Sequence, residues 1–350
     1  MENNSNFRVN LKSLTFSELE EFIAGLAVEK YRAKQLATWI FKKGVTSFQE
    51  MTDLSKGLRE RLETAAWIST PDIKAKLKSK RGDTVKYLFG LSDGQAVESV
   101  YMKHDYGSSA CVSTQVGCRY ACRLCASGLG GLVRDLDAGE IYDQALGIEK
   151  DSGERISHLV IMGSGEPLDN YRATLTFIKN IAAIYGLNIG YRHITISTCG
   201  LAPGIRRLAA ERLPLTLAVS LHAPNDSLRD WLVPINKRHP LPELIAACRD
   251  YARETGRRIT FEYALIAGVN DSREHAEELC GLLSGMLCHV NLIPANPVAE
   301  RGIKPPAKKQ VELFKSILEG NMLATTVRRE FGADINAACG QLRRRILSES

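Results

Sequence analysis

Hydrophobic residues recur every three to four positions through the first part of the chain, which predicts helices. The first such run follows Thr15 and Glu18, whose spacing is typical of a capping box at the start of a helix. A second run covers residues 31–43, and a third lies around residues 54–62. We therefore expect a small N-terminal helical accessory domain at residues 1–68.

The hydrophobic period changes in the next part of the chain, residues 69–107, which we expect to form a β extension. Three alternating runs predict three strands, separated by turns at residues 81–83 and 92–94. Four lysines alternate along the first run, so an extended strand would project all of them from one face: Lys74, Lys76, Lys78 and Lys80. Two interpretations stay open, a solvated edge strand that resists aggregation and a ridge that contacts phosphates.

From about residue 108 onward, short apolar runs alternate with amphipathic helical patterns. Repeated strand–helix units imply a parallel sheet, either open and doubly wound or closed toward a barrel. The runs expected as strands are ACVST, ISHLVIMG, HITIST, LTLAVSL, RITFEYAL, HVNLIP and MLATTV. The chain therefore belongs to the α/β class, with residues 108–350 as its core.

The composition narrows the class of protein further. The 350 residues are 44% hydrophobic and 25% charged, as in ordinary soluble globular proteins. No stretch approaches 18 consecutive apolar residues, and the first residues lack a basic region followed by an apolar core. We expect a cytoplasmic protein with no membrane partner, and the net charge of +6 is a mild indication of an anionic one.

Four of the nine cysteines lie within residues 111–125, and such clustering in an intracellular chain indicates metal or redox chemistry. Cys118, Cys122 and Cys125 are separated by three and two residues. With that spacing, each thiolate can bind a different iron of a 4Fe-4S cluster, and the fourth iron stays open to a small molecule. The alternative is structural zinc with Cys111 as the fourth ligand, in an RNA-binding protein without catalysis.

Polar residues and glycines follow successive predicted strands, at the end where barrel enzymes place their reactive groups. Gly165 and Glu166 follow one strand, and the Glu166 carboxylate could accept hydrogen bonds from an ammonium group. Comparable positions after three other strands are occupied by Ser197, Ser220, His222 and Asn296. Each of these alone is more often a helix cap or a structural residue, but their recurrence favours a binding site.

The cysteine triplet resembles the signature of the radical S-adenosylmethionine superfamily, in which the open iron binds that cofactor. The motifs MGSGEP, STCG, SLHAPND, VPINKR, GVND, NLIPANP and DINAACGQL resemble, in order, the RlmN/Cfr family of radical S-adenosylmethionine RNA methyltransferases. The resemblance covers nearly the whole chain and implies a partial (β/α)6 barrel, a 4Fe-4S cluster and two S-adenosylmethionine molecules per turnover. It also implies that Leu221, within SLHAPND, contacts the cofactor. The chain departs from the family pattern at Leu124, Ser164 and Cys199.

The same resemblance implies roles for three further residues. Cys339 would receive a methyl group from one S-adenosylmethionine, and an adenosyl radical from the second would remove a hydrogen from it. Glu98 would act as the general base that takes the proton from the adenine carbon after the ring has joined Cys339. Cys111 would then attack the Cys339 sulfur, form a disulfide and release methylated RNA. Without the resemblance, the sequence favours buried free thiols for Cys111 and Cys339. It favours a solvated carboxylate on a strand for Glu98.

At positions 167 and 223 the chain has Pro167 and Ala223, as in the RlmN branch of the family. This resemblance implies methylation of carbon 2 of adenosine 2503 in 23S rRNA and of adenosine 37 in tRNA. The alternatives are methylation of carbon 8, as in the Cfr branch, and another radical enzyme such as a methylthiotransferase, whose second set of three cysteines has no counterpart here. The family chemistry also requires an electron donor such as flavodoxin or ferredoxin. An RNA partner would explain three consecutive arginines as phosphate contacts: Arg343, Arg344 and Arg345.

Overall fold

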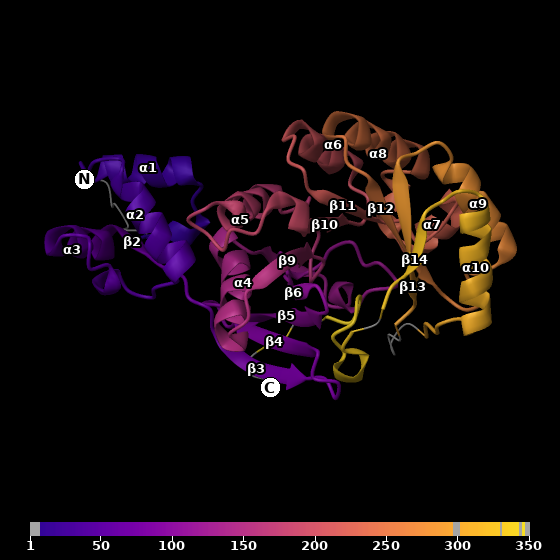
Figure 1. The fold of residues 1–350 in the computed structure, drawn as a ribbon, viewed down its shortest axis with the longest axis horizontal. Helices are drawn as coiled ribbons and strands as arrows, with labels where there is room; N and C mark the ends of the chain where they lie inside the picture. The colour runs from indigo at the N-terminus through magenta and orange to yellow at the C-terminus, as the bar shows by residue number, and fades with distance from the viewer. Residues whose placement is uncertain (1–7, 297–301, 330, 343–344, 347–350) are drawn as a thin grey trace.

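The computed structural model describes residues 8–296, 302–329, 331–342 and 345–346. Its centre is one curved sheet of eleven strands with helices along its outer side (Figure 1). Arg343 and Arg344 lie outside the described residues, and of Arg345 only the backbone is described. In the described part of the chain, no helix has the length and apolar composition needed to cross a bilayer.

Seven neighbouring strands of the sheet are parallel and form the partial barrel that the strand–helix alternation predicts. In spatial order they are β6 (Gly107–Cys111), β9 (Ile156–Ile161), β10 (Ile194–Thr198), β11 (Thr216–Ser220), β12 (Ile259–Leu265), β13 (Cys288–Pro294) and the short β14 (Thr325–Val327). Because parallel strands need crossover connections, a helix returns the chain after each of the six longer strands. The expected α/β class and barrel are therefore confirmed.

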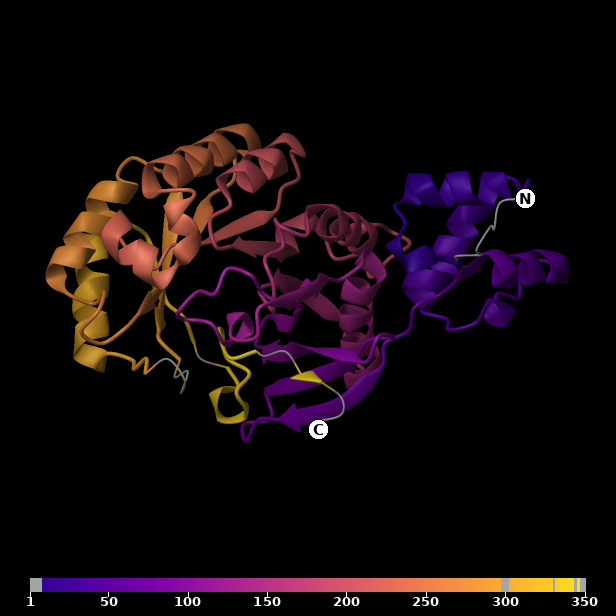
Figure 2. The ribbon, with the colours of Figure 1, turned by 180° about the vertical axis from the view of Figure 1, so that it is seen from behind.

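The helices cover the convex face of the barrel, and their apolar faces bury its core (Figures 1 and 2). They are α4 (Ala138–Ser152), α5 (Tyr171–Ala182), α6 (Ala202–Ala210), α7 (Asp226–Leu232), α8 (Leu241–Thr255), α9 (Arg273–Leu283) and α10 (Lys308–Gly320). Asp137 and Glu140 form a capping box at the start of α4. Helix α4 is preceded by a two-stranded sheet of β7 (Gln115–Gly117) and β8 (Leu132–Asp135), which the sequence analysis did not predict.

The β extension continues the same sheet in antiparallel fashion beyond β6. It consists of β3 (Ile73–Lys78), β4 (Thr84–Gly90) and β5 (Gln95–His104), as the alternation predicts, and Gly82 and Gly94 adopt the positive φ angles of its turns. Strand β3 is an exposed edge, but the lysine ridge is only partly regular. Lys74 lies at a bulge, and Lys80 lies in the turn after the strand. Lys74 and Lys76 are also paired, with Asp72 and Asp151, at 2.8 Å each.

The N-terminal module packs against α4 and α5 at one end of the molecule (Figures 1 and 2). It contains the short parallel strands β1 (Val9–Asn10) and β2 (Ala66–Trp67) and the helices α1 (Phe16–Gly25), α2 (Arg32–Thr38) and α3 (Lys56–Ala65). The capping box of Thr15 and Glu18 is present. Helix α2 continues as one π-helical turn that ends at Gly44, whose φ is 61°. The Lys12 ammonium anchors the module at 2.5 Å from the Asp143 carboxylate of α4, and both side chains are buried.

The last described segment crosses the open side of the barrel, from β14 back to the extension (Figure 2). Within it, residues 333–335 form a 3-10 turn, and residues 345–346 form β15, which pairs antiparallel with β5. Ala337 and Leu342 of this segment pack on Val100 and Met102 of β5. The segment that carries Cys339 is therefore attached to both edges of the opening.

Candidate active site

The three clustered cysteines lie in the loop between β7 and β8, at the carboxyl end of β6. Ala121 adopts φ 50°, and the neighbouring Gly128 comes so close that a Cβ there would lie 2.8 Å from the Cα of Ala121. The backbone N–H of Arg123 donates to the carbonyl of Leu232 at 2.9 Å, and that of Ala126 donates to the carbonyl of Gly340 at 2.7 Å. The loop is thus held both by the barrel and by the segment that carries Cys339.

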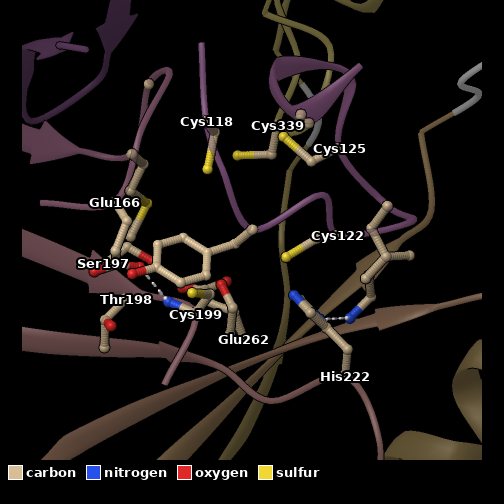
Figure 3. A pocket seen from close by; sticks show the side chains of 18 of the residues that line it. Cys118, Cys122, Cys125, Glu166, Ser197, Thr198, Cys199, His222, Glu262 and Cys339 are labelled. Carbon is tan, nitrogen blue, oxygen red and sulfur yellow. Dashed lines mark hydrogen bonds between the residues drawn. The ribbon is translucent and has the colours of Figure 1, made fainter. Parts of the chain in front are cut away.

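The sulfurs of Cys118, Cys122 and Cys125 point into one cavity from different sides (Figure 3). In the described chain, no three His, Cys, Asp or Glu side chains lie close enough together to hold a single metal ion. The three sulfurs are therefore not gathered for one zinc ion. Three separated thiol groups that face the same space fit an iron–sulfur cluster, in which each thiolate binds its own iron.

Burial and one neighbouring thiol set the protonation of these cysteines. Burial raises the pKa of Cys118 to about 12, and burial also raises the pKa of Cys125. The pKa of Cys122 is lowered, chiefly because the thiol of Cys199 donates a hydrogen bond to its sulfur. Cys199, where the family usually has serine, therefore acts as a donor to a candidate cluster ligand.

The same cavity is bounded by the carboxyl ends of β9 and β10. Gly165 adopts φ 106°, and a side chain there would collide with Gln115, since an added Cβ would lie 2.6 Å from the Cβ of that residue. The buried Glu166 carboxylate accepts from the backbone N–H groups of Leu168, at 3.0 Å, and Cys199, at 2.7 Å. These bonds orient the carboxylate and leave it further lone pairs for a ligand.

Arg229 of α7 ties the next strand ends together. Its side chain is fully buried and donates to the carbonyls of Cys199, at 2.7 Å, and Ser220, at 3.2 Å. It also donates to Asn236 of the VPINKR motif at 2.8 Å. Ser197 and Ser220 line the cavity, and Ser220 has its carbonyl fixed by this guanidinium.

His222 faces the same cavity from the loop after β11 (Figure 3). Its Nδ1 accepts from the backbone N–H of Ala264 at 3.0 Å, and its carbonyl accepts from the buried Asn270 of the GVND motif at 2.8 Å. Burial lowers the pKa of His222 to about 3. The imidazole is therefore neutral and can present an Nε2–H donor to a ligand. The side chain of Leu221, by contrast, is buried in the core and does not line the cavity.

A second cavity of about 770 Å³ adjoins the first and contains the other two cysteines of interest. Cys339 lines both cavities, and Cys111 lines the second. Burial raises the pKa of Cys111 to about 12, and the nearby Arg328 guanidinium acts in the opposite direction. Asn296, expected at the cofactor, lines both cavities and donates its side-chain N–H to the Cys339 carbonyl at 3.0 Å.

Glu98 lies in β5 beside the second cavity but does not line it. The residue is only 3% exposed, and its carboxylate lies 3.2 Å from the ammonium group of Lys86. Glu98 is therefore not the solvated strand carboxylate that the sequence favours apart from the resemblance. Lys86 also donates to the carbonyl of Asn336, in the Cys339 segment, at 3.2 Å. Side chains two apart on a strand share a face, so Glu98 lies on the same face of β5 as Val100, which does line the cavity.

Three charged residues of this region were not predicted from the sequence. Glu262 lines the first cavity and accepts from Asn291 at 2.9 Å, and burial raises its pKa. Arg328 lines both cavities and lies 3.8 Å from Glu262. The third residue is Lys86. Two of the three could have been recognised in the sequence, because each is a charged residue within an apolar strand run. Glu262 lies in RITFEYAL, and Lys86 lies in TVKYLFG.

Comparisons with known proteins identify the family of this chain. Residues 9–68 match the family model "Ribosomal RNA large subunit methyltransferase N-terminal domain", and residues 112–280 match "Radical SAM superfamily". A "Probable dual-specificity RNA methyltransferase RlmN" of Pelotomaculum thermopropionicum is 69% identical over 97% of this chain and 92% of its own length. A protein of the same description from Desulforamulus reducens is 58% identical over 99% of both chains. The crystal structure of a radical SAM methyltransferase from Sphaerobacter thermophilus has a TM-score of 0.89 and 46% identity, covering 95% of this chain and 99% of that one.

Proposed function

The chain belongs to the RlmN family of radical S-adenosylmethionine methyltransferases, and from this membership we propose that it methylates carbon 2 of adenosine in RNA. The proposed substrates are adenosine 2503 of 23S rRNA and adenosine 37 of tRNA. The description of both relatives as dual-specificity enzymes supports two kinds of RNA substrate. Methylation of carbon 8 is the outcome that this proposal excludes.

Cys118, Cys122 and Cys125 would hold the 4Fe-4S cluster, and S-adenosylmethionine would lie against Glu166, Ser197, Ser220 and His222. When bound, these groups supply the adenosyl radical that removes a hydrogen from a methyl group on Cys339. The neutral His222 offers a donor, and the oriented Glu166 carboxylate an acceptor, for the polar groups of the cofactor. Gly165 also lines this cavity, and its positive φ and its close contact with Gln115 leave no space for a side chain there.

The observation that carries the proposal is the position of Cys339 at the junction of the two cavities. From there its sulfur can receive a methyl group from one S-adenosylmethionine on the cluster side and present it to a base in the second cavity. In the proposed reaction, as the family resemblance implies, two S-adenosylmethionine molecules are used per turnover, one as methyl donor and one as radical source. The second cavity, at about 770 Å³, has the size of a small-molecule site and would admit a nucleoside.

Two further residues complete the proposed reaction. Glu98 takes the proton from the adenine carbon once the base is bonded to Cys339 through the methylene group, and the unpaired electron left by the radical addition would return to the oxidised cluster, so that the ring is aromatic again. Cys111 then attacks the Cys339 sulfur as a thiolate, and an S–S bond forms. The C–S bond breaks with its electron pair on the methylene carbon, which takes a proton to become the methyl group of the released base. The disulfide is reduced again before the next cycle. A low-potential electron donor such as flavodoxin or ferredoxin supplies the electron for radical formation.

The test is anaerobic reconstitution with iron and sulfide, followed by incubation with an rRNA fragment, S-adenosylmethionine and a reductant. Mass spectrometry of the digested nucleosides should show 2-methyladenosine from the wild type and none from Cys339→Ala. Cys111→Ala should accumulate a covalent protein–RNA adduct, visible as a shifted band on a denaturing gel.

Cys280→Ala is the matched control, because Cys280 is a partly buried thiol outside both cavities. It should give wild-type product. Methylated RNA from Cys339→Ala would disprove the carrier role, and 8-methyladenosine as the product would disprove the assignment to carbon 2.

A further inference from the structure

A group of aromatic and imidazole rings surrounds a third cavity, of about 400 Å³, at the opposite end of the barrel strands from the cysteine loop. We call this group the ring cluster, and its members are His104, Tyr106, His158, His193 and Phe331. His104 stacks on Tyr106 with a centroid distance of 4.7 Å and an interplanar angle of 11°. The other rings contact this pair and one another edge-on, so that the five rings form a connected chain.

The ring cluster is accessible from solvent. Tyr106 is 69% exposed, and His193 is also exposed, whereas His104 and His158 are partly buried beneath them. Burial lowers the pKa of both His104 and His158, so these two rings are neutral at pH 7. Neutral rings at the edge of an open cavity offer flat surfaces for stacking.

Positive charge at this cavity comes from arginines rather than histidines. Arg192, Arg328 and Arg329 line it, and Asp105 is the acidic residue among its described lining residues. Arg328 also lies 3.8 Å from Glu262, and Arg329 lies 3.7 Å from Asp83. The guanidinium of Arg329 lies over the ring of Phe331, 5.1 Å from its centroid. In the described chain, no three potential ligands gather for one metal ion, so the histidines do not form a metal site. Rings combined with arginines fit a planar, anionic ligand, as a nucleotide is.

The third cavity adjoins the second, which is lined by Cys111 and Cys339. Four residues line both of them: Met102, Arg328, Arg329 and Phe331. Because strand side chains alternate, His158 and Met162 lie on the same face of β9 and its extension, and Met162 lines the second cavity. Four residues of strand span about 13 Å, so the two cavities could each take one base of an unpaired RNA segment whose bases are splayed apart.

We propose that the ring cluster binds a second, unpaired nucleotide of the RNA substrate, next to the methylated adenosine, by stacking its base on Tyr106. This inference rests on the proposed RNA methyltransferase function, since the second cavity is taken to hold the target base. Proteins recognise unpaired RNA bases in this way, by stacking them on aromatic, histidine and arginine planes. The target base must itself leave the stack to reach the Cys339 sulfur between the two cavities, which also separates it from its neighbours.

The test measures binding of a fluorescent rRNA hairpin, with the target adenosine in its loop, to cluster-loaded protein by anisotropy. Tyr106→Ala combined with His158→Ala should weaken binding between about fivefold and about a hundredfold, the range measured for loss of one base–aromatic stack. Tyr106→Phe should retain wild-type affinity because it keeps the ring. Met322→Ala is the matched control, since Met322 is 94% exposed and lies in the turn before β14.

Two further measurements locate the effect. Formation of 5′-deoxyadenosine without RNA should be equal in all variants, which shows that the cluster cavity is intact. Hairpins with 4-thiouridine on either side of the target adenosine should cross-link, on irradiation, to the peptides that contain Tyr106 or His158. Unchanged affinity of the double variant, or cross-links only to other peptides, would overturn the proposal.

The outcomes also separate this proposal from the proposed function. If the hairpin binds, depends on Tyr106 and His158 for affinity, but is never methylated, the nucleotide site stands and the methyltransferase assignment fails. If the wild type methylates the hairpin while the double variant binds it equally well, only the nucleotide site fails. A wild type that does not bind the hairpin would overturn both.

Discussion

At the scale of single residues, the Cys111 thiol is subject to two opposing influences on its pKa. Burial and the neighbouring Cys339 raise it, to about 12, whereas the Arg328 guanidinium acts to lower it. Arg328 is held in this position beside the Glu262 carboxylate, at 3.8 Å. Because the thiolate is the nucleophile in disulfide formation, the proposed release of RNA should be limited by the small thiolate fraction of Cys111 at neutral pH.

This argument predicts a steep pH dependence for the release step. With a pKa of about 12, the thiolate fraction of Cys111 rises about tenfold for each pH unit below that value, so release should quicken about tenfold from pH 7 to pH 8. Single-turnover reactions, quenched over time and resolved on denaturing gels, would follow decay of the protein–RNA adduct. The amount of 5′-deoxyadenosine formed in the same samples serves as the control. A decay rate that is flat between these pH values would contradict the prediction.

Glu98 and Lys86 illustrate what the sequence leaves open at this scale. The alternation of apolar residues predicts their strands, but it does not predict that a lysine and a glutamate are buried against each other at 3.2 Å. That pairing depends on the register between β4 and β5 and on the segment at Asn336, which lies about 250 positions away from Lys86. The roles of Glu98, Cys111 and Cys339 stay predictions of the family resemblance, although the structure brings their neighbourhoods together.

At the scale of elements, the segment that carries Cys339 is docked on the cysteine loop by short backbone contacts. Gly340 adopts φ 80°, and its carbonyl accepts from the N–H of Ala126 at 2.7 Å. Ser127 donates to the carbonyl of Leu342 at 2.8 Å. The position of the Cys339 sulfur therefore depends on how closely two backbones approach at Gly340.

Gly340→Ala should disturb this docking, because an added Cβ would lie 2.5 Å from the Leu124 carbonyl oxygen. A displacement of about 1 Å can cost about 100-fold in rate, so we expect a loss of that order in methylation of Cys339. Peptide mass spectrometry of Cys339 would measure it, and iron analysis should show a full cluster. Gly256→Ala is the control, because Gly256 also has a positive φ but no neighbour within 4 Å. Equal effects of both substitutions would contradict the prediction.

Helix α7 contributes the guanidinium that joins the ends of β10 and β11. Arg229→Lys keeps the charge but loses the planar fork that reaches the carbonyls of Cys199 and Ser220 at once. Leaving a buried carbonyl unsatisfied costs about 1–3 kcal/mol, and we expect binding of S-adenosylmethionine to weaken by about tenfold or more. Equilibrium dialysis would measure the affinity. The exposed Arg253 supplies the control, Arg253→Lys, and unchanged affinity in Arg229→Lys would argue against a positioning role.

The sequence predicts elements well where the hydrophobic pattern is long and regular, as in β9 and α8. Prediction from the sequence fails where tertiary contacts determine whether a strand forms and where it ends. Strands β7 and β8 have only three and four residues and are recognisable only as a pair, and Lys80 falls outside β3 because the turn begins before it. The strand-end residues around the first cavity could be predicted because parallel strands bring their carboxyl ends together. The ring cluster could not be predicted from the sequence, because its members come from four separate places in the chain.

At the scale of the whole molecule, the N-terminal module and the barrel share one buried interface. Lys12 is 1% exposed and donates to the carbonyl of Ser69 at 2.6 Å as well as to Asp143. Across the same interface, the Asn180 side chain of α5 donates to the carbonyl of Leu14 at 2.8 Å. The division at residues 68 and 107 stays a prediction of the sequence pattern.

Lys12→Met should destabilise the protein strongly, because it leaves the Asp143 carboxylate buried without its partner. Loss of one member of a buried ion pair costs about 3–5 kcal/mol. Urea unfolding of the cluster-free chain, followed by circular dichroism, would measure the change. The double variant Lys12→Met with Asp143→Leu should recover much of the stability, since no charge then remains in the interface. A single variant as stable as the wild type would contradict the buried pairing.

The anchoring of the Cys339 segment at both β14 and β15 has a kinetic consequence. In the proposed reaction, the Cys339 sulfur, on a segment anchored at both ends, would meet Cys111 at an effective concentration set by the tether rather than by diffusion through the solution. Glutathione and other small thiols would have to enter an occupied cavity to intercept the adduct, and they compete poorly against a nucleophile that is already inside. In the proposed reaction, the architecture of the barrel opening would therefore select the attacking nucleophile, and cellular thiols would act only afterwards, when the emptied enzyme is returned to its reduced form.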